Sequence, residues 1–207
     1  MKKLFILGAG QLGKAILSLI KEKKNYRVIG FVDPYSKKSK YDGIKIFKSE
    51  KILLNKKEKI NLVLGVGDIM LRKKLIKTFS GNKFNFLSII FDEKALNKNI
   101  KIEKGCIVMP NTFILNNTKI GKFCLIGTSV TILHDVTIGK NCVIGGGTLI
   151  GANTFLDDEI LVGVGSVFSS NKKKIGSNSI VCAGSVVHKS IKKNSKVIGN
   201  PLKFLPK

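Results

Sequence analysis

Histidine stands next to a carboxylate at one place in this chain, the pair His134-Asp135 in the stretch ILHDVTIGKNCVIGGG. Acyl transfer from a thioester requires a base that takes a proton as an amine or hydroxyl attacks, and hydrogen-bond donors for the developing oxyanion. The pKa of an unperturbed imidazole is about 6.5, so histidine is a natural base near neutral pH. His134 is therefore the candidate base, and the alternative is an exposed histidine without a role.

Glycines near the N-terminus form a second chemical motif. The segment Gly8–Gly13, GAGQLG, matches GxGxxG and follows the predicted strand KKLFIL. The next apolar residues have helical spacing, namely Leu12, Ala15, Ile16, Leu19 and Ile20. A second predicted strand, YRVIGFV, ends at Asp33, twenty residues after Gly13. This arrangement binds a mononucleotide, with phosphate at the helix N-terminus and the acid near the ribose. The alternative is a glycine turn that only joins strand to helix.

The rest of the first hundred residues extends this α/β pattern. We predict a strand at residues 61–67, a helix from Asp68 to about Phe79 and a strand at residues 84–90. The resulting Rossmann-like domain, residues 1–95, has room for one nucleotide-binding half, whereas NAD needs two. A mononucleotide, such as that of a nucleotide sugar, fits this domain better than NAD.

The second half of the chain has a six-residue repeat. An aliphatic residue recurs at Ile102, Val108, Ile114, Ile120, Ile126, Ile132, Ile138, Ile144, Ile150, Leu156 and Val162. A small or β-branched residue follows four positions later each time, from Cys106 to Ser166, and glycine often follows the aliphatic residue. This period fits neither a helix nor a simple strand, but it fits a three-sided coil with one hexapeptide on each side. We predict a left-handed parallel β-helix over residues 96–207, with Gly and polar residues at the corners, where positive φ is easiest for Gly and Asn.

The cysteines follow the same repeat. Cys106, Cys124 and Cys142 are spaced by three hexapeptides, one full coil, so we expect them to stack inside the prism as small hydrophobic side chains. Cys142 is eight residues from His134, which raises the alternative of a covalent thiol route. The inward position favours direct transfer. The chain has no CxxC pair and two histidines, so we expect no metal site.

The charge pattern limits the classes of partner. The net charge is +24, but the basic residues are nearly all lysines spread along the chain. We expect a solvated lysine surface that can attract a polyanionic substrate, and no nucleic-acid partner. No uncharged apolar run is long enough for a membrane span, and Leu4 to Leu7 is too short for a signal-peptide core. The prediction is a cytoplasmic protein.

A short Rossmann-like domain followed by hexapeptide repeats resembles the NeuD/PglD family of bacterial sugar acyltransferases over essentially the whole chain. The segments that carry the resemblance are GAGQLG, FVDP, LGVGDIMLRKK, ILHDVTIGKNCVIGGG and VIGNPLKFL. The resemblance implies transfer of acetyl from acetyl-CoA to the amine of a UDP- or dTDP-linked 4-amino-4,6-dideoxy sugar in polysaccharide biosynthesis. It also implies a homotrimer with active sites between subunits.

The resemblance assigns roles to individual residues. His134 would be the general base and Asp135 would orient the imidazole. The nucleotide sugar would bind at Gly8, Gly10, Gln11, Gly13, Asp33, Gly65 and Gly67. Acetyl-CoA would bind in the groove between neighbouring helices, at Cys142, Gly145, Gly163 and Gly184. Some family members carry a histidine in the glycine loop, where this chain has Gln11 or Leu12, and a second histidine at the place of Cys142.

Several other functions compete with this one. A γ-type carbonic anhydrase needs three histidines on zinc, and this chain has two histidines. Serine or maltose acetyltransferases lack the N-terminal nucleotide-binding half, and an NAD-dependent oxidoreductase needs a second half and a catalytic domain. Two alternatives remain open, an O-acetyltransferase acting on a sugar hydroxyl of the sialic acid type and a non-catalytic β-helix that binds a nucleotide sugar.

Overall fold

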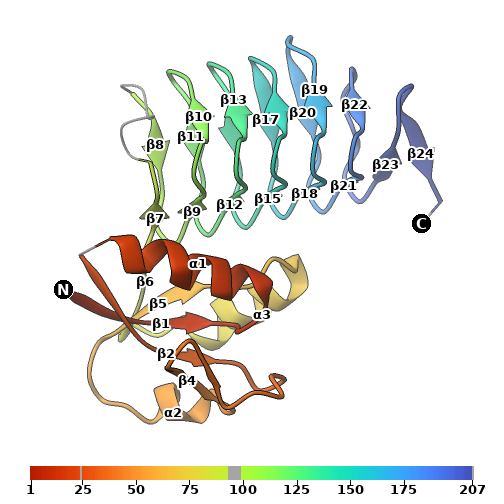
Figure 1. The fold of residues 1–207 in the computed structure, drawn as a ribbon. Helices are drawn as coiled ribbons and strands as arrows, with labels where there is room; N and C mark the ends of the chain where they lie inside the picture. Colours follow the sequence, from red (N-terminus) through yellow and green to blue (C-terminus); the bar gives the residue numbers. More distant parts are fainter. Residues whose placement is uncertain (24, 93–98, 207) are drawn as a thin grey trace. The chain divides into compact units, whose positions relative to one another are not determined.

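The computed structural model describes residues 1–23, 25–92 and 99–206, and the chain divides into two compact units, Met1–Ser88 and Ile89–Lys207 (Figure 1). The predicted boundary between residues 95 and 96 lies outside the described residues. The predicted strand at residues 84–90 is divided between the units, because its first part joins the N-terminal sheet and its last two residues pair with Ile107 and Val108 of the repeat.

The first unit is an α/β domain. Its elements are β1 (Lys2–Leu7), α1 (Gln11–Glu22), β2 (Tyr26–Val32), β3 (Lys40–Tyr41), β4 (Ile44–Phe47), α2 (Lys51–Leu54), β5 (Ile60–Leu64), α3 (Ile69–Thr78) and β6 (Phe84–Phe86). The sheet order is β3-β4-β2-β1-β5-β6, parallel except for the β3–β4 hairpin. The strand order reverses at β1, so the loops after β1, β2 and β5 share the edge where such sheets bind ligands.

The second unit is a parallel β-helix of three sheets, which confirms the predicted repeat architecture. The β13 sheet contains β10 (Phe113–Ile114), β13 (Thr131–Ile132), β16 (Leu149–Ile150), β19 (Val167–Phe168) and β22 (Val186–Val187). The β14 sheet contains β8 (Lys101–Ile102), β11 (Lys119–Ile120), β14 (Thr137–Ile138), β17 (Thr154–Leu156) and β20 (Lys173–Ile175). The β15 sheet contains β7 (Ile89–Ile90), β9 (Ile107–Val108), β12 (Leu125–Ile126), β15 (Val143–Ile144), β18 (Leu161–Val162), β21 (Ile180–Val181), β23 (Lys196–Ile198) and β24 (Lys203–Leu205).

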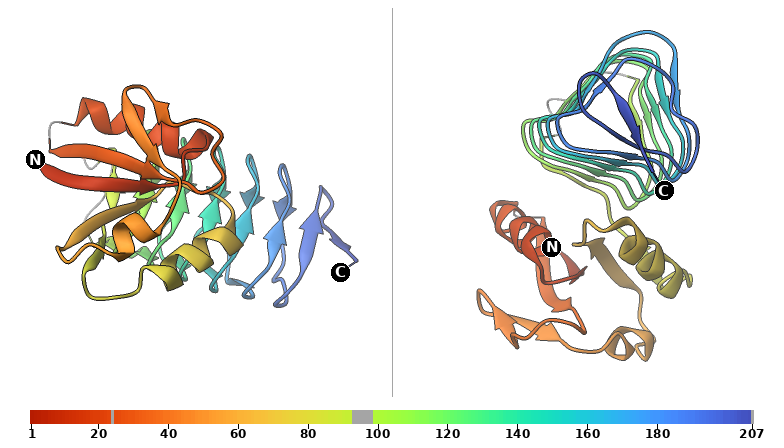
Figure 2. Two further views of the ribbon diagram at one scale, coloured as in Figure 1. Left: turned by 90° about the horizontal axis from the view of Figure 1, so that it is seen from below. Right: turned by 90° about the vertical axis from the view of Figure 1, so that its right-hand side faces the viewer.

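The core of this unit consists of the two predicted ladders. Viewed along the axis, the coils form a stack of triangles (Figure 2). Every aliphatic position from Val108 to Val162 and every small position from Cys106 to Ser166 is at most 2% exposed. Ile102, in the first coil, is half-buried. Because a fully buried aliphatic side chain contributes about 1.5–3 kcal/mol, the stacked ladders account for the stability of very short strands.

Gly and Asn occupy most of the corners with positive φ, as predicted, for example Asn111, Asn141, Gly147 and Gly165. The left-handed residue lies directly before each small inward residue, as in Asn117 (φ 59°), Asp135 (φ 58°) and Asn153 (φ 59°). The glycines that follow the aliphatic residues have a different function. A Cβ on Gly127 would lie 2.6 Å from the backbone nitrogen of Gly146 in the next coil. These glycines are therefore required by close stacking and not by positive φ.

The regular repeat ends with one inserted residue. Ile138 pairs with Leu156 at the regular spacing, whereas the partner of Leu156 is Ile175, one position beyond the regular one. Lys173 takes the inward place next to Thr154 and is 6% exposed. Its ammonium group donates to the carbonyl oxygens of Ser169 and Ser170 at 2.6 and 2.7 Å, and burial lowers its pKa. The lysine therefore holds the loop that contains the insertion.

Candidate active site

His134 and Asp135 lie on a corner between two stacked coils, which we call the dyad edge, where the β13 sheet passes into the β14 sheet. Asp135 N–H donates to the carbonyl oxygen of Asn116 in the preceding coil, at 3.1 Å. The carbonyl oxygen of His134 accepts from Asn153 N–H in the following coil, at 3.2 Å. Both backbone groups are fixed by their neighbours, so the dyad has a rigid support.

The two side chains form a hydrogen bond of 2.6 Å between His134 Nδ1 and Asp135 Oδ2. Asn117 Nδ2 donates to the other carboxylate oxygen at 3.1 Å. The hydrogen bond with His134, followed by that with Asn117, lowers the pKa of Asp135. A carboxylate can only accept, so the hydrogen of the neutral imidazole must be on Nδ1. Nε2 then has the free lone pair that a general base needs.

A groove lies directly beside the dyad on the β14 sheet. Its volume is about 550 Å³, and it is lined by Asn99, Lys101, Asn117, Lys119, Asp135 and Thr137. The side chain of His134 is 53% exposed in the single chain. The dyad can therefore reach a ligand that lies on this edge, and the two lysines give that ligand a positive surface.

The position of Cys142 contradicts its assignment as a contact for acetyl-CoA. Cys142 is 0% exposed, and its Sγ donates to the carbonyl oxygen of Asp157 at 3.1 Å. Cys124 makes the same contact with Gly139, and burial raises the pKa of its thiol. The raised pKa disfavours the thiolate of Cys124, and the full burial of Cys142 keeps its thiol away from any ligand on the surface. The thiol ladder therefore packs the core.

The other positions assigned to acetyl-CoA lie on a different corner of the same β-helix. Gly145, Gly163 and Gly184 follow strands of the β15 sheet and precede strands of the β13 sheet, and we call this corner the glycine edge. Within one chain, the glycine edge and the dyad edge are separated by the width of the β13 sheet. The predicted binding of acetyl-CoA between subunits would therefore require that the glycine edge of one subunit faces the dyad edge of another.

The nucleotide-binding candidates of the first unit meet at the carboxyl ends of its strands. Gly8 N–H donates to the carbonyl oxygen of Val32, and Gly65 N–H donates to that of Leu7, which joins the three loops. The cavity between them is only about 30 Å³, close to the volume of one water molecule. The predicted nucleotide would therefore have to bind on the outer surface of these loops.

The motif glycines differ in why they lack a side chain. A Cβ on Gly13 would overlap the carbonyl oxygen of Gly8, and a Cβ on Gly65 would lie 2.5 Å from Ile6. Gly8 has φ 99° and no space for a side chain beside Val66. A Cβ on Gly10 or Gly67 would meet no atom within 4 Å. Internal packing thus explains Gly8, Gly13 and Gly65, but it does not explain Gly10 and Gly67.

The N-terminus of α1 is available for an anion. Gly10 is the N-cap, and no side chain caps the first turn, which begins at the exposed Gln11. The N–H groups of a first helical turn have no partner within the helix, and the helix dipole favours negative charge there. This geometry suits the predicted phosphate contact.

Asp33 has a structural function that the motif did not indicate. Its Oδ2 accepts from Ala9 N–H at 2.8 Å, and its Oδ1 accepts from the N–H groups of Tyr35 and Ser36 at 2.9 and 3.1 Å. The carboxylate thus joins the glycine loop to the loop after β2. Its contact with a ribose remains a prediction.

Arg72 is a residue of this site that sequence reasoning missed. Arg72 is 0% exposed, and its guanidinium donates to the carbonyl oxygen of Val66 at 2.8 Å. This contact fixes the loop that contains Gly65 and Gly67. One signal was available, because Arg72 is one of two arginines in a chain where lysine supplies nearly all the positive charge.

The described residues offer neither a membrane span nor a metal site. Within residues 1–23, 25–92 and 99–206, no helix is long and apolar enough to cross a bilayer. The same residues contain no cluster of three or more His, Cys, Asp and Glu side chains that could hold a metal ion.

Family models match both halves of the chain. The model of the PglD N-terminal domain matches residues 3–79, and the model of the bacterial transferase hexapeptide (six repeats) matches residues 117–152. These matches confirm the resemblance inferred from the sequence. No curated protein sequence matches the chain significantly.

Solved structures with the same fold extend over the whole chain. A histidine-to-asparagine mutant of perosamine N-acetyltransferase from Caulobacter crescentus, in complex with CoA and GDP-perosamine, superimposes with a TM-score of 0.90 at 21% identity, covering 100% of this chain and 98% of that one. The acetyltransferase domain of PglB from Neisseria gonorrhoeae, with acetyl coenzyme A, gives 0.88 at 22% identity and 98% of both chains. WeeI from Acinetobacter baumannii gives 0.85 at 22% identity, covering 99% of this chain and 100% of that one. At these identities, the similarity establishes the fold.

Proposed function

Because the chain joins a PglD N-terminal domain to bacterial transferase hexapeptide repeats, we propose that it is a cytoplasmic sugar N-acetyltransferase that uses acetyl-CoA. The acceptor is the amine of a UDP- or dTDP-linked 4-amino-4,6-dideoxy sugar. The observation that carries the proposal is the bond of 2.6 Å between His134 and Asp135 beside an open groove. Structures of the same fold with CoA, acetyl coenzyme A or GDP-perosamine support both substrate classes.

In the proposed mechanism, His134 Nε2 removes a proton from the attacking amine while the amine adds to the thioester carbonyl. Asp135 holds Nδ1–H and stabilises the imidazolium that forms, and Asn117 keeps the carboxylate in place. Collapse of the tetrahedral intermediate then breaks the C–S bond and forms the amide, and the imidazolium of His134 gives its proton to the CoA thiolate, which leaves as a thiol. No covalent enzyme intermediate is required, in agreement with the burial of Cys142.

The substrate test is a panel of UDP-, dTDP- and GDP-linked amino sugars, each incubated with acetyl-CoA and analysed by mass. We expect one sugar to gain an acetyl group and an equal amount of free thiol to appear. The GDP-linked sugar is included because a solved structure of this fold contains GDP-perosamine. A matched nucleotide sugar with a hydroxyl in place of the amine completes the panel, and its acetylation would identify an O-acetyltransferase. A nucleotide sugar that binds without any release of free thiol would support the alternative of a non-catalytic binding protein.

The β13 sheet is the proposed interface of a homotrimer. Its outward side chains Phe113, Leu149 and Val167 are 46%, 37% and 39% exposed in the single chain, which makes an apolar stripe. This sheet lies between the dyad edge and the glycine edge. Packing through it around a threefold axis would bring the dyad edge of one subunit to the glycine edge of the next. Such a head-to-tail contact closes into a ring.

We therefore expect sedimentation at micromolar concentration to give about three times the chain mass of 22.7 kDa. Leu149→Glu should dissociate the trimer and abolish most activity, because it places a charge in the stripe and separates the two edges. Lys196→Glu, on the β15 sheet, is the matched control and should leave the trimer and the activity unchanged. A fully active monomer would contradict this account of the site.

A further inference from the structure

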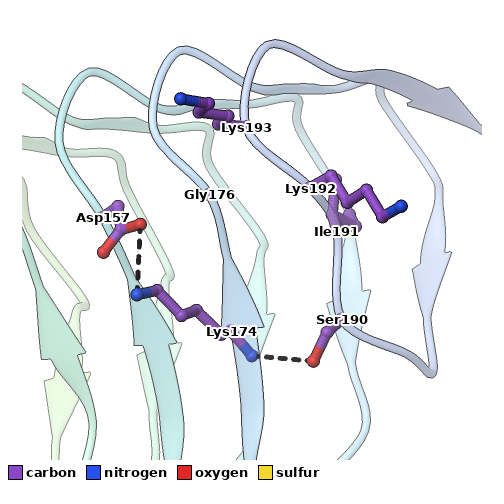
Figure 3. Close-up of a pocket in the computed structure, with 7 residues that line it drawn as sticks. All are labelled: Asp157, Lys174, Gly176, Ser190, Ile191, Lys192 and Lys193. Atoms are coloured by element: carbon purple, nitrogen blue, oxygen red, sulfur yellow. Dashed lines mark hydrogen bonds and ion pairs between the residues drawn. The ribbon is translucent and has the colours of Figure 1, made fainter.

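A second groove lies at the other end of the β14 sheet, where the coils become smaller. Leu156 pairs with Ile175, a full coil later in the sequence. Ile175 in turn forms an isolated bridge with Ile191, and fewer residues separate these two, so the last coil is shorter than the one before it. In the view along the axis, the last coil lies inside the outline of the earlier ones (Figure 2). The step leaves a groove of about 460 Å³, lined by Asp157, Lys174, Ser190, Ile191, Lys192 and Lys193 (Figure 3).

The charges of this groove suit a doubly charged anion. Three lysines and one aspartate line the groove, so its charged side chains carry a net charge of +2. Lys174 Nζ lies 3.7 Å from Asp157 Oδ2, and the lysine side chain is 67% exposed, so this ion pair is weak and can open. Lys192 and Lys193 extend in opposite directions from the corner, as Figure 3 shows. A phosphate monoester has a charge of about −1.5 to −2 at pH 7 and would balance the groove.

The groove also contains a hydroxyl donor and apolar surface. Ser190 Oγ accepts from the backbone N–H of Lys174 at 3.0 Å, so its own hydrogen can donate to a ligand. Ile191, which is 3% exposed, also lines the groove. Phe155, one coil earlier, is 41% exposed, and Lys174 Nζ lies 5.5 Å from its ring centroid. The organic part of a ligand could therefore bind against carbon while the phosphate meets the cations.

We propose that this groove is a subsite for a phosphate monoester, separate from the groove beside the dyad. Three coil steps lie between Ile138, in the dyad's coil, and Ile191, which corresponds to about 14 Å along the axis at the usual strand spacing. Two sources of the phosphate fit this position. One is the 3′-phosphate of coenzyme A, in which case the inference rests on the proposed function. The other is a free phosphorylated small molecule.

The first experiment measures binding and requires no catalysis. The probe is adenosine 3′-monophosphate, titrated calorimetrically into the full chain at low salt, with adenosine as the uncharged comparison. We expect the Lys192→Gln/Lys193→Gln double variant to bind the probe at least tenfold more weakly than the unchanged protein. Lys122→Gln, an exposed lysine on the same corner of an earlier coil, should bind it normally. Equal binding by the double variant, or equal binding of adenosine, would overturn the proposal.

The second experiment identifies the source of the phosphate. The KM for acetyl-CoA is compared with that for acetyl-dephospho-CoA, which lacks the 3′-phosphate. The groove holds the acyl donor if the double variant raises the KM for acetyl-CoA to that for acetyl-dephospho-CoA and leaves the KM for acetyl-dephospho-CoA unchanged. If binding of the probe is lost but both KM values stay the same, the groove holds a separate phosphate monoester. If no acetyl transfer is found with any sugar, the proposed function fails while the calorimetry still tests the groove.

Discussion

Replacing His134 with alanine is expected to lower kcat by about 10²–10⁴-fold, the usual contribution of a general base. The KM values for acetyl-CoA and for the nucleotide sugar should change little, because the base acts in the transition state more than in binding. The rate of thiol release at saturating concentrations of both substrates measures the effect. The variant should fold normally, since the His134 side chain is 53% exposed and points away from the ladders.

Asp135→Asn should cost less than the loss of His134, because the imidazole remains but is held less well. The backbone makes this substitution a clean test. Asp135 has φ 58°, and asparagine already occupies the equivalent corner at Asn117 and Asn153 with φ 59°. Alanine at the same position would add the strain of a left-handed residue. A lower rate in that variant could then come from lost catalysis or from lost stability.

Cys142→Ser is the control for the direct mechanism. The thiol is fully buried and donates to the carbonyl oxygen of Asp157, and a serine hydroxyl can donate to the same oxygen, as Ser166 does to carbonyl oxygens in this ladder. The free energy of unfolding should therefore fall by no more than about 1 kcal/mol. The kcat of the folded variant should remain close to that of the unchanged protein. If the serine variant is folded and inactive while His134→Ala retains activity, the direct mechanism is wrong and a covalent thiol route replaces it.

The β-helix could be predicted because its architecture depends on a strict period. Each coil places a residue beside the one three hexapeptides later, so the stacking of Cys106, Cys124 and Cys142 follows from counting. The same count places Asn117 under Asp135. It does not show that the amide and the carboxylate point toward each other, which depends on their side-chain torsions. The hydrogen bond of 3.1 Å therefore emerged only from the structure.

The first unit was less predictable, since its elements depend on contacts distant in sequence. The hairpin of β3 and β4 and the short helix α2 contain no strong periodic signal. The segment at residues 84–90 has continuous strand character, and only its partners in two different sheets divide it. The motif GAGQLG likewise does not distinguish Gly10 from Gly13. In the structure, a Cβ on Gly13 would overlap another residue, whereas a Cβ on Gly10 would meet open space.

That contrast yields the second large prediction, a selective loss of nucleotide-sugar binding in Gly10→Val. A Cβ at Gly10 would meet no protein atom within 4 Å, so the first side-chain atom of valine would cause no clash. It would, however, stand in front of the uncapped first turn of α1, where the phosphate is proposed to bind. Losing one hydrogen bond to a charged group costs about 1.5–3 kcal/mol, so the KM for the nucleotide sugar should rise about 10–100-fold. The KM for acetyl-CoA should stay within about twofold, because the dyad and its groove belong to the other unit.

Gly13→Ala is the matched comparison, because the same loop is changed where internal packing leaves no space. Its Cβ would overlap the carbonyl oxygen of Gly8, so we expect this variant to lose stability instead of affinity alone. Thermal unfolding followed by circular dichroism separates the two outcomes, since Gly10→Val should unfold close to the temperature of the unchanged protein. If Gly10→Val raises both KM values equally, the loop only joins β1 to α1. The nucleotide sugar must then bind elsewhere, and the N-terminal unit would need a different function.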